Sequence, residues 1–443
     1  RQPNVIFIMA DDLGYRDLGS YDHPQIQTPR LDQLATEGMR LTNFHAGASV
    51  CAPSRMSLLT GAYPIRLGWT QGVPGYKMGM KDGMSPEALT IAEIFRSAGY
   101  ATGISGKWHI GNMPATRPHQ QGFDWTYYIS HSNNQVNSLR RGDEIIEQPF
   151  NNRLLTEQFT RQAIEFINNH RDQPFFLYLS YTAPHFPVEP HPEWKDHSSF
   201  GKYGDVVEEL DARIGEVLDR LDELKLRDDT IVIFCSDNGP QNGQQASAAP
   251  LRGKKWSPLE GGTRVPFIIC WPKAVPAGSE SEALVSAIDM LPTLSRACGI
   301  DWQAKSDDKP VIDGVDVWPT LSGQNKPHPR HELLHWMGFS PDPKAIQIDG
   351  WKLYFDRADA VEKIRADVLT PAQKKRLETY QKNLNPDGPN PPFLVNLDED
   401  IGETKDLSRK FPEKVKALQA RADTLLTEIR RTPPLPIVGP DEK

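Results

Sequence analysis

The chain alternates short apolar runs with longer segments in which apolar residues recur every three or four positions. Runs of the first kind predict strands buried on both faces, and segments of the second kind predict amphipathic helices. The predicted strands are Val5–Met9, Tyr100–Ser105, Phe175–Ser180, Thr230–Cys235 and Val265–Trp271. Because such strands alternate with helices along the chain, we expect an α/β domain with a mostly parallel or mixed sheet.

Helix signals lie between these strands. Thr28-Pro29 combines an N-cap residue with a proline at the first helical position, which predicts a helix running to Gly38. Further helices are expected at 90–97 and 154–168, each directly before a predicted strand. The clearest amphipathic segment carries apolar residues at three-to-four spacing: Val206, Val207, Leu210, Ile214, Val217, Leu218 and Leu221. This order of helices and strands supports the α/β prediction.

The pattern changes after about residue 322, where a polar, proline-containing stretch follows. We expect this stretch to connect a larger domain at 1–325 to a smaller α+β domain at 326–443. The smaller domain is predicted to contain an antiparallel strand pair over Ala345–Phe355, a charged helix over roughly 359–382, a strand at 393–397 and a terminal helix at about 412–429.

Charge and composition exclude several classes of protein. A formal net charge of −8 and a pI near 5.9 argue against nucleic acid as a partner, although a local basic pocket can still bind an anion. No apolar run is long enough to span a bilayer, and the 4 cysteines provide no disulfide framework. We expect a secreted or periplasmic protein whose signal peptide has been removed, or a lysosome-like location in a eukaryote.

The most informative local motif is Cys51-Ala52-Pro53-Ser54-Arg55. Pro53 suits the first turn of a helix, because its missing N–H costs nothing there. Cys51 would therefore lie just before a helix N-terminus, where unpaired N–H groups and the helix dipole favour an anion. Arg55 adds a fixed positive charge in the first turn. Taken alone, the motif is also compatible with a buried cysteine before an ordinary helix.

Carboxylate and amide side chains follow two of the predicted strands. Asp11-Asp12 comes directly after the first strand, and Asp237-Asn238 follows the strand that ends at Cys235. Adjacent carboxylates repel each other unless a cation lies between them, and oxygen ligands suit Ca²⁺ or Mg²⁺ rather than zinc. Ligands gather at the carboxyl ends of strands in open α/β sheets. Each motif alone would be a helix cap or a turn, but together they predict a metal site.

Three further loops carry cations or histidines. Lys107 and His109 alternate in an extended segment, so both side chains can face one pocket. His185 lies between two prolines in a stiff loop, which favours a positioned acid or base. The charged run at 252–255 includes Lys254 and Lys255, which could neutralise an anionic ester. Surface histidines and a solvated charge run are the ordinary alternatives, but with the carboxylates these residues predict transfer of an anionic ester group.

Taken together, these segments resemble the type I sulfatases of the alkaline-phosphatase-like superfamily. The resemblance rests on C-x-P-S-R at 51–55, GKWHxG at 106–111, APHxP at 183–187 and SDNG at 236–239, in this order. It covers essentially the whole chain, as far as VNLDEDIGETKDL at 395–407. It implies an alkaline-phosphatase-like α/β fold, a large mixed sheet sandwiched by helices, with a smaller C-terminal α+β domain.

The resemblance also implies two cofactors. In this family the cysteine of the motif is oxidised to formylglycine, so a formylglycine-generating enzyme would act on Cys51 during maturation. The hydrate of that aldehyde attacks the sulfur of a sulfate ester, and the S–O bond is cleaved. One Ca²⁺ would be held by the modified residue together with Asp11, Asp12, Asp237 and Asn238.

Roles for the other site residues are carried over by motif position. Arg55 would stabilise the nucleophile, and Lys107 would contact a sulfate oxygen. His109 would act as the base that leads to release of sulfate, and His185 would protonate the leaving oxygen.

The basic loop and the substrate contacts complete the predicted site. In the family the functional lysine stands five residues before the Glu of the EGG stretch, which selects Lys255. Lys254 stands where glycine is common, so the charge at this point is doubled. Ser130 resembles a serine that some arylsulfatase-like members place near the sulfate. Trp108 is one of several aromatic residues whose faces could stack on a sugar ring, so we expect a sulfated carbohydrate as substrate.

Two other functions remain open from the sequence. The first is a phosphodiester or phosphonate monoester hydrolase, because related superfamily members use a similar aldehyde and metal site on phosphorus. The second is a non-catalytic protein that binds sulfated glycans, although every expected site residue is present in this chain.

Overall fold

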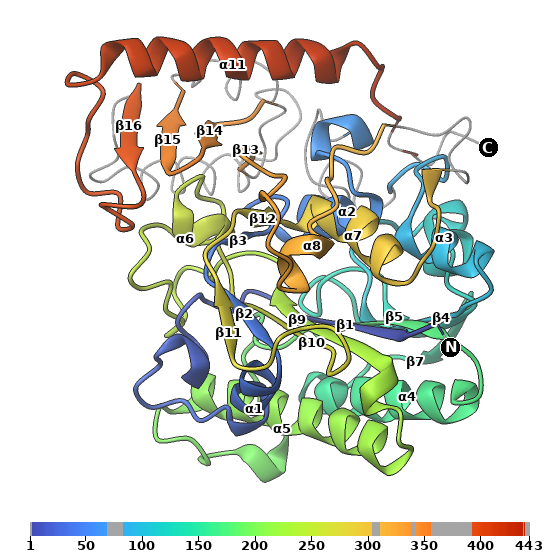
Figure 1. Ribbon diagram of the computed structural model, residues 1–443. Coiled ribbons are helices and arrows are strands. Elements are labelled where there is room, and N and C mark those ends of the chain that lie inside the picture. Colours follow the sequence, from blue (N-terminus) through green and yellow to red (C-terminus); the bar gives the residue numbers. More distant parts are fainter. Residues whose placement is uncertain are drawn as a thin grey trace.

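A large β-sheet lies between two layers of helices, and a smaller sheet lies above it in the view of Figure 1, which shows the computed structural model. The structure describes residues 2–68, 83–303, 311–337, 342–355, 392–436 and 438. In chain order, the strands of the large sheet are β1 Asn4–Ala10, β2 Met39–Leu41, β4 Ala101–Lys107, β5 Trp125–Ile129, β6 Leu139–Arg141, β7 Glu144–Glu147, β8 Phe175–Ser180, β9 Thr230–Ser236, β10 Phe267–Cys270 and β11 Ser279–Ser281. Within the described residues their spatial order is β11-β2-β10-β9-β1-β8-β4-β5-β6-β7.

The central strands of the large sheet run parallel and end at one edge. β1 pairs in parallel with β8 on one side and with β9 on the other, and β8 pairs in parallel with β4. The register aligns Met9 with Ser180 and Ala10 with Ser236. Every residue of β1, β8 and β9 is buried, as expected for strands covered on both faces. The loops that follow these strands therefore meet at the same edge of the sheet.

Helices cover both faces of this sheet (Figure 1). They are α1 Pro29–Glu37, α4 Leu155–His170 and α5 Lys202–Glu223 on one face, and α2 Cys51–Thr60, α3 Ile91–Ser97 and α7 Met290–Ala297 on the other. Ile6 and Ile8 of β1 pack with the first layer, whereas Val5 and Phe7 pack with the second. Alternate residues of a strand point to opposite faces, so β1 contributes to both cores. The predicted mixed sheet sandwiched by helices is confirmed.

The smaller sheet is antiparallel and is covered by the last helix. Its strands are β13 Glu332–His335, β14 Ala345–Ile348, β15 Trp351–Tyr354 and β16 Phe393–Asn396, in that spatial order, and the helix is α11 Pro412–Arg430. Leu418, Ala422 and Leu426, four residues apart, form the buried face of α11. The predicted strand pair and terminal helix are confirmed, whereas the charged helix expected at 359–382 lies outside the described residues.

Short elements join the two sheets. They are β3 Phe44–His45, β12 Val285–Ser286, α6 Glu260–Thr263 and α8 Trp318–Leu321. A hydrophobic cluster contains Ala48 and Ala52, beside and within the start of α2, together with Leu334 and Ile346 of the smaller sheet. The smaller sheet thus packs against the segment that carries Cys51. Of the helices in the described ranges, none combines the length and apolar character needed to cross a membrane.

Candidate active site

Cys51 lies where the carboxyl ends of the central strands meet the start of α2. The helix begins at Cys51 itself, whereas Cys51 was expected to lie before the helix, and Val50 is the extended residue that precedes the first turn. The side chain is buried, with 1% of its surface exposed. Its N-terminal position in α2 places unpaired backbone N–H groups and the positive end of the helix dipole nearby. This arrangement stabilises negative charge at position 51.

The Cys51 thiol is surrounded by charged groups of both signs. Its Sγ lies 3.1 Å from Nζ of Lys255 and 3.4 Å from Oδ1 of Asp11. Burial raises the pKa of Cys51 well above its ordinary value, and the charge of Asp237 adds to this, while Lys107 and Lys255 act in the opposite direction. The unmodified thiol is therefore protonated at neutral pH and is a poor nucleophile.

Asp11 and Asp12 follow β1 directly, and each is paired with a lysine from another loop. Asp11 Oδ2 accepts a hydrogen bond from Lys107 Nζ at 2.6 Å, and Asp12 Oδ1 lies 2.6 Å from Lys255 Nζ. Burial alone would raise the pKa of both carboxyls. The nearby cations outweigh it, so the pKa of Asp11 falls to about 2 and that of Asp12 also lies below its ordinary value. Both side chains are therefore ionised at neutral pH.

Arg55 forms a buried ion pair with the third carboxylate, Asp237, which follows β9. The Nε and a terminal nitrogen of Arg55 donate to Oδ2 of Asp237 at 2.9 and 2.7 Å. Arg55 also donates to the carbonyl of Lys107 at 3.2 Å and to Ser180 Oγ. All four residues are inaccessible to solvent, so the charges are paired and hydrogen-bonded, as buried charges must be.

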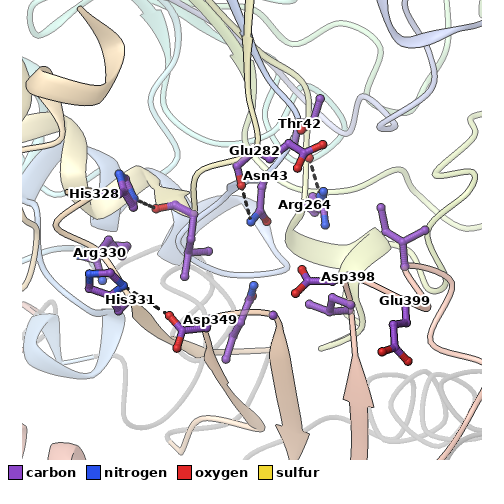
Figure 2. A pocket seen from close by; sticks show the side chains of 15 residues that line it. Thr42, Asn43, Arg264, Glu282, His328, Arg330, His331, Asp349, Asp398 and Glu399 are labelled. Carbon is purple, nitrogen blue, oxygen red and sulfur yellow. Dashed lines mark hydrogen bonds and ion pairs between the residues drawn. The ribbon is translucent and has the colours of Figure 1, made fainter. Parts of the chain in front are cut away.

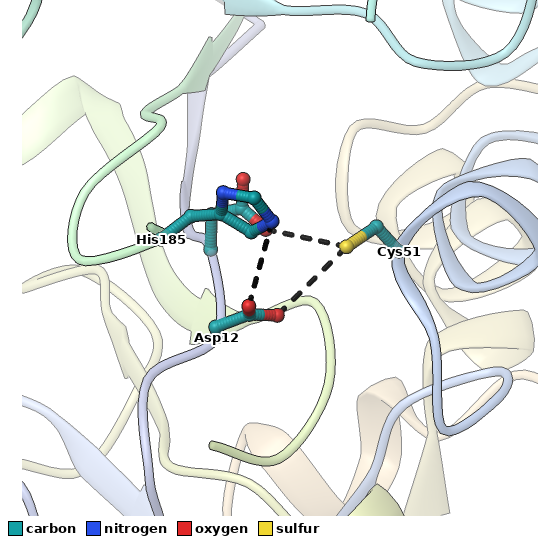
Figure 3. Close-up of side chains that lie close together, drawn as sticks. Asp12, Cys51 and His185 are labelled. Atoms are coloured by element: carbon teal, nitrogen blue, oxygen red, sulfur yellow. Dashed lines mark hydrogen bonds and ion pairs between the residues drawn. The ribbon is translucent and has the colours of Figure 1, made fainter. Parts of the chain in front are cut away.

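The oxygen atoms around Asp12 form a plausible cage for a hard cation. Ligand atoms of Asp11, Asp12, Cys51 and His185 all lie within 4.8 Å of one another, and Figure 3 shows three of these side chains converging. Asn238 donates its Nδ2 to Asp12 Oδ1 at 2.7 Å, while its buried Oδ1 has no hydrogen-bond partner among the described residues. A buried amide oxygen without a partner is costly, and a bound cation would satisfy it. The donor set therefore fits Ca²⁺.

His185 points one ring nitrogen into this site and the other away from it. Its Nε2 lies 3.6 Å from Asp12 Oδ2, whereas its Nδ1 lies 3.0 Å from Asn133 Oδ1 and 2.6 Å from the carbonyl of Phe186. Burial lowers the pKa of His185, and the charges of Asp11 and Asp12 oppose that shift. The sequence analysis did not identify Asn133, because an asparagine in a loop carries no motif signal.

His109 is buried, with 4% of its surface exposed. Its backbone adopts φ 61°, in the left-handed region, and its N–H donates to the carbonyl of Ser130 at 3.1 Å. Both ring nitrogens are buried and have no hydrogen-bond partner among the described residues. Burial, followed by the charge of Lys107, places the pKa of His109 well below its ordinary value, so the ring is a neutral base.

Ser130 and His131 form the wall beside His109. Ser130 Oγ lies 3.3 Å from Nδ1 of His131, and the His109 and His131 rings are 5.8 Å apart between centroids. Ser130, predicted near the sulfate, is 1% exposed and shares this wall. His131 was not singled out from the sequence, although it lies in the same segment.

The structure separates Lys255 from its neighbour Lys254. Lys255 is buried and contacts Cys51 and Asp12, whereas Lys254 Nζ turns away and donates to the carbonyl of Ala246 at 3.1 Å. The N–H of Ser257 donates to the carbonyl of Lys254 at 2.9 Å and closes a turn here, and the two lysine side chains leave this turn in different directions. Lys254 and Lys255 both line a cavity of about 500 Å³ formed by residues of this loop.

Trp108 is in the core rather than at a surface. It stands between Lys107 and His109, and its alternate position along the extended backbone directs it away from the site. The indole is 0% exposed, donates Nε1 to the carbonyl of Thr116 at 2.9 Å and packs against Phe123. Its faces are covered by protein in this structure, so they offer no platform for a sugar ring.

A second cavity of about 580 Å³ lies between the two sheets and contains none of the predicted site residues (Figure 2). Several of its polar side chains are bonded to one another or to the backbone. Arg264 Nε donates to the carbonyl of Thr42 at 2.6 Å, and His331 lies 3.4 Å from Asp349. The candidate catalytic residues therefore lie around Cys51 and not in this cavity.

Comparisons with known proteins agree with this geometry. A family model described as Sulfatase matches residues 3–300. The arylsulfatase A of Bos taurus is 33% identical, over 94% of this chain and 86% of its own length. The N-acetylgalactosamine-6-O-sulfatase of Bacteroides thetaiotaomicron is 31% identical, over 96% of this chain and 94% of its own. A solved sulfatase structure from Pseudoalteromonas sp. has a TM-score of 0.83 at 25% identity, covering 99% of this chain and 92% of that chain.

Proposed function

This chain belongs to the sulfatase family and is a sulfuric ester hydrolase, and on that premise we propose that it removes sulfate from a sulfated carbohydrate. We propose further that it does so with formylglycine derived from Cys51 and with one Ca²⁺. The observation that carries this proposal is the convergence of three buried carboxylates and three buried cations on position 51. Such a cluster suits the binding and transfer of an anionic group.

The charge balance around Cys51 supports an anionic substrate. The three carboxylates are matched by three cations, so a divalent metal held there would leave an excess of positive charge. This excess favours a sulfate ester together with an anionic nucleophile. Arg55 stays bound to Asp237 through two N–H groups, whereas Lys107 and Lys255 carry flexible ammonium groups that can bind sulfate oxygens.

The state of the thiol supports modification of Cys51. As a thiol, this residue is buried, protonated and a poor nucleophile. A neutral thiol gives no reason for cations to be placed around it. A formylglycine at this position would supply, as its hydrate, one hydroxyl to attack sulfur and a second whose deprotonation releases sulfate. Maturation would then require a formylglycine-generating enzyme acting on the segment around Cys51.

Calcium is supported by the chemistry of the donor set. Asp11, Asp12, Asp237 and Asn238 offer hard oxygen atoms, and the buried Oδ1 of Asn238 has no hydrogen-bond partner among the described residues. A bound Ca²⁺ would supply Lewis acidity that lowers the pKa of the nucleophilic hydroxyl. Arg55, at the start of α2, adds a fixed positive charge that favours the same anion.

The two histidines suit opposite proton transfers. The Nε2 of His185 faces the open side of Asp12, where it can donate a proton to the leaving oxygen of the substrate. His109 is neutral, and neither of its buried ring nitrogens has a hydrogen-bond partner in the described ranges, so it can accept a proton from a hydroxyl at position 51. Lys107 would bind a sulfate oxygen through its positively charged ammonium group.

Sulfated carbohydrate is favoured as the substrate by relatives that cover nearly the whole chain. The Bacteroides thetaiotaomicron relative, named for N-acetylgalactosamine-6-O-sulfate hydrolysis, matches 96% of this chain. Other relatives are named arylsulfatase and steryl-sulfatase, so aryl and alkyl sulfates belong in the same test. Export from the cytoplasm and the domain boundary near residue 325 stay predictions.

The experiment that tests this proposal has two parts. Peptide mass spectrometry of the tryptic segment 41–55, from protein made in its native host, should give the mass of an aldehyde at position 51 instead of a thiol. The same protein should then be assayed with sulfated monosaccharides, an aryl sulfate and matched phosphate esters.

Each outcome separates the candidate functions. An aldehyde with turnover of sulfated sugars supports the proposal. A dominant rate with phosphodiesters or phosphonate monoesters would instead favour the phosphorus-ester hydrolase. Binding of sulfated sugars without turnover, by fully modified protein, would favour the non-catalytic glycan-binding protein.

A further inference from the structure

The segment at 395–407 has no role in the proposed chemistry, but one of its carboxylates is buried against the loop at 252–260. Glu403 is 0% exposed and comes from the loop after β16. Its Oε2 accepts the backbone N–H of Glu260, the first residue of α6, at 2.9 Å. Its Oε1 accepts the hydroxyl of Tyr354 in β15. Glu403 therefore ties the start of α6 to the smaller sheet.

A second bond from the smaller sheet reaches the same helix. Lys352 of β15 is fully buried and donates to Glu260 Oε1 at 2.6 Å and to the carbonyl of Pro258 at 3.1 Å. Glu260 also accepts from Arg264 at 3.2 Å, so its charge is satisfied by two cations. Buried charges are tolerated only with such partners, so Lys352, Glu260 and Arg264 must keep these positions relative to one another.

α6 is in direct backbone contact with the loop that carries Lys255. The N–H of Gly261 donates to the carbonyl of Arg252 at 2.8 Å. A Cβ at Gly261 would lie 2.3 Å from the carbonyl oxygen of Gly253, and one at Gly262 would lie 2.1 Å from that of Ser257. The two glycines are therefore required because the loop lies against the helix with no room for a side chain.

The loop is anchored at its other contacts as well. Arg252 donates to the backbone carbonyl of Glu403 at 3.0 Å, so Glu403 holds both ends of the segment 252–260. Within that segment, Trp256 N–H donates to the carbonyl of Ser49 at 2.7 Å, two residues before Cys51. Lys255 thus lies 3.1 Å from Cys51 Sγ. Its loop is held on one side by Ser49, just before α2, and on the other by Glu403, which follows the last strand of the smaller sheet.

We propose that Glu403 and Lys352 are positioning residues that hold the ammonium group of Lys255 against position 51, an inference that rests on the proposed function of that site. A lysine side chain loses considerable rotamer entropy when it is fixed, so its backbone must be held in place. Within the part of the chain that the structure describes, the smaller sheet places no group against Cys51 and instead completes the active site by fixing this loop.

A double-mutant cycle tests whether Glu403 acts through Lys255. Glu403→Gln keeps the size of the side chain but places an NH₂ group against one of the two donors, Glu260 N–H or Tyr354 O–H, so it loses one of the two bonds. We expect it to lower kcat for an aryl sulfate about 10-fold, and Lys255→Ala to lower it about 100-fold. The double variant should be no slower than Lys255→Ala, because the two changes act on the same group. Multiplicative losses in the double variant would overturn the proposal.

The matched control is Asp400→Asn, in the same loop as Glu403. Asp400 accepts the N–H groups of Thr404 and Lys405 and orders the loop locally, so its replacement should leave kcat unchanged. If Glu403→Gln fails to fold, Tyr354→Phe removes one bond of the same network and Lys352→Met removes two, and both variants enter the same cycle. A lower Tm with unchanged kcat in these variants would show a purely structural role and overturn the proposal.

Hydrogen exchange separates this inference from the proposed function. In Glu403→Gln the amides of Trp256 and Gly261 should exchange faster than in the parent protein, whether or not the protein turns over sulfate esters. An inactive parent with faster exchange in the variant would reject the proposed function alone. Unchanged exchange at both amides would reject the positioning role.

Discussion

Asn133 Oδ1 lies 3.0 Å from Nδ1 of His185, and this contact orients the histidine. The amide nitrogen of Asn133 is already used, because it donates to Asn152 Oδ1 at 2.7 Å. The amide oxygen must therefore face the ring, and the carbonyl of Phe186 at 2.6 Å is a second acceptor at the same nitrogen. Nδ1 consequently carries a proton, and Nε2 is directed at Asp12 and the site.

Replacement of Asn133 should impair leaving-group protonation. Asn133→Ala removes one acceptor and frees the His185 ring, so kcat for an alkyl or sugar sulfate should fall about 10-fold or more. An aryl sulfate whose phenol is acidic should lose much less, because its phenolate departs without a proton. Steady-state kinetics with a series of leaving groups measures the difference. Asn137→Ala is the control, since Asn137 instead bonds to the exposed Gln148, and equal losses across the series would contradict the role.

Replacement of Cys51 should abolish turnover without unfolding the protein. Cys51→Ser is nearly isosteric at the first position of α2, so the Tm should change by only a few degrees. Serine has one hydroxyl and cannot supply the second that a formylglycine hydrate offers, so multiple turnover should stop. Kinetics and thermal melting on the same sample measure both effects. Repeated turnover near the parent rate would contradict the formylglycine mechanism.

Removal of metal should abolish activity and leave the fold intact. The carboxylates at the site keep their lysine and arginine partners without a metal, so the chelated protein should retain its circular dichroism spectrum. Activity should return with Ca²⁺ and not with Zn²⁺, because the donors are hard oxygen atoms. Full activity in a sample verified as metal-free would remove the calcium assignment.

Stability should fall as the pH rises from about 4 to about 7. Burial raises the pKa of Glu209 to about 7 and of Asp211 to about 7, and it raises that of Glu403 to about 7. A raised pKa in the folded state stabilises the fold below the unfolded value, and this contribution is lost as the pH passes through about 7. Each group should contribute on the order of 1 kcal/mol per pH unit in that window.

Glu209→Gln isolates one of these groups. Glu209 Oε2 accepts the N–H of His191 at 2.8 Å, while its buried Oε1 has no hydrogen-bond partner among the described residues. A neutral amide should therefore raise the Tm at pH 8 and flatten its dependence on pH. Melting curves of parent and variant between pH 5 and 8 measure this, and parallel curves would contradict the shift. Asp11 and Asp12, with lowered pKa values, act in the opposite direction and only below about pH 4.

Much of the fold and of the site could be predicted because the signals are local. A run such as Val5–Met9 is apolar on both faces, and that alone predicts a covered strand whose end lies at a sheet edge. Polar residues directly after such runs, as at Asp11 and Asp237, were therefore expected at one edge, and the parallel register of β1 with β9 brings them there. The start of α2 was expected too late in the sequence, since Cys51 is already helical and the extended Val50 precedes it.

The sequence by itself determined which chemistry the strand ends carry, because strand periodicity and motif spacing are properties of neighbouring residues. Motif position selected Lys255, but only the tertiary structure showed that Lys254 turns away, since that depends on where Ser49 and α6 hold the loop. It likewise decided the roles of Asn133 and Glu403, whose partners lie 52 and 143 residues away along the chain. Contacts across such separations leave no periodic trace, because they depend on the packing of whole elements rather than on local residue preference.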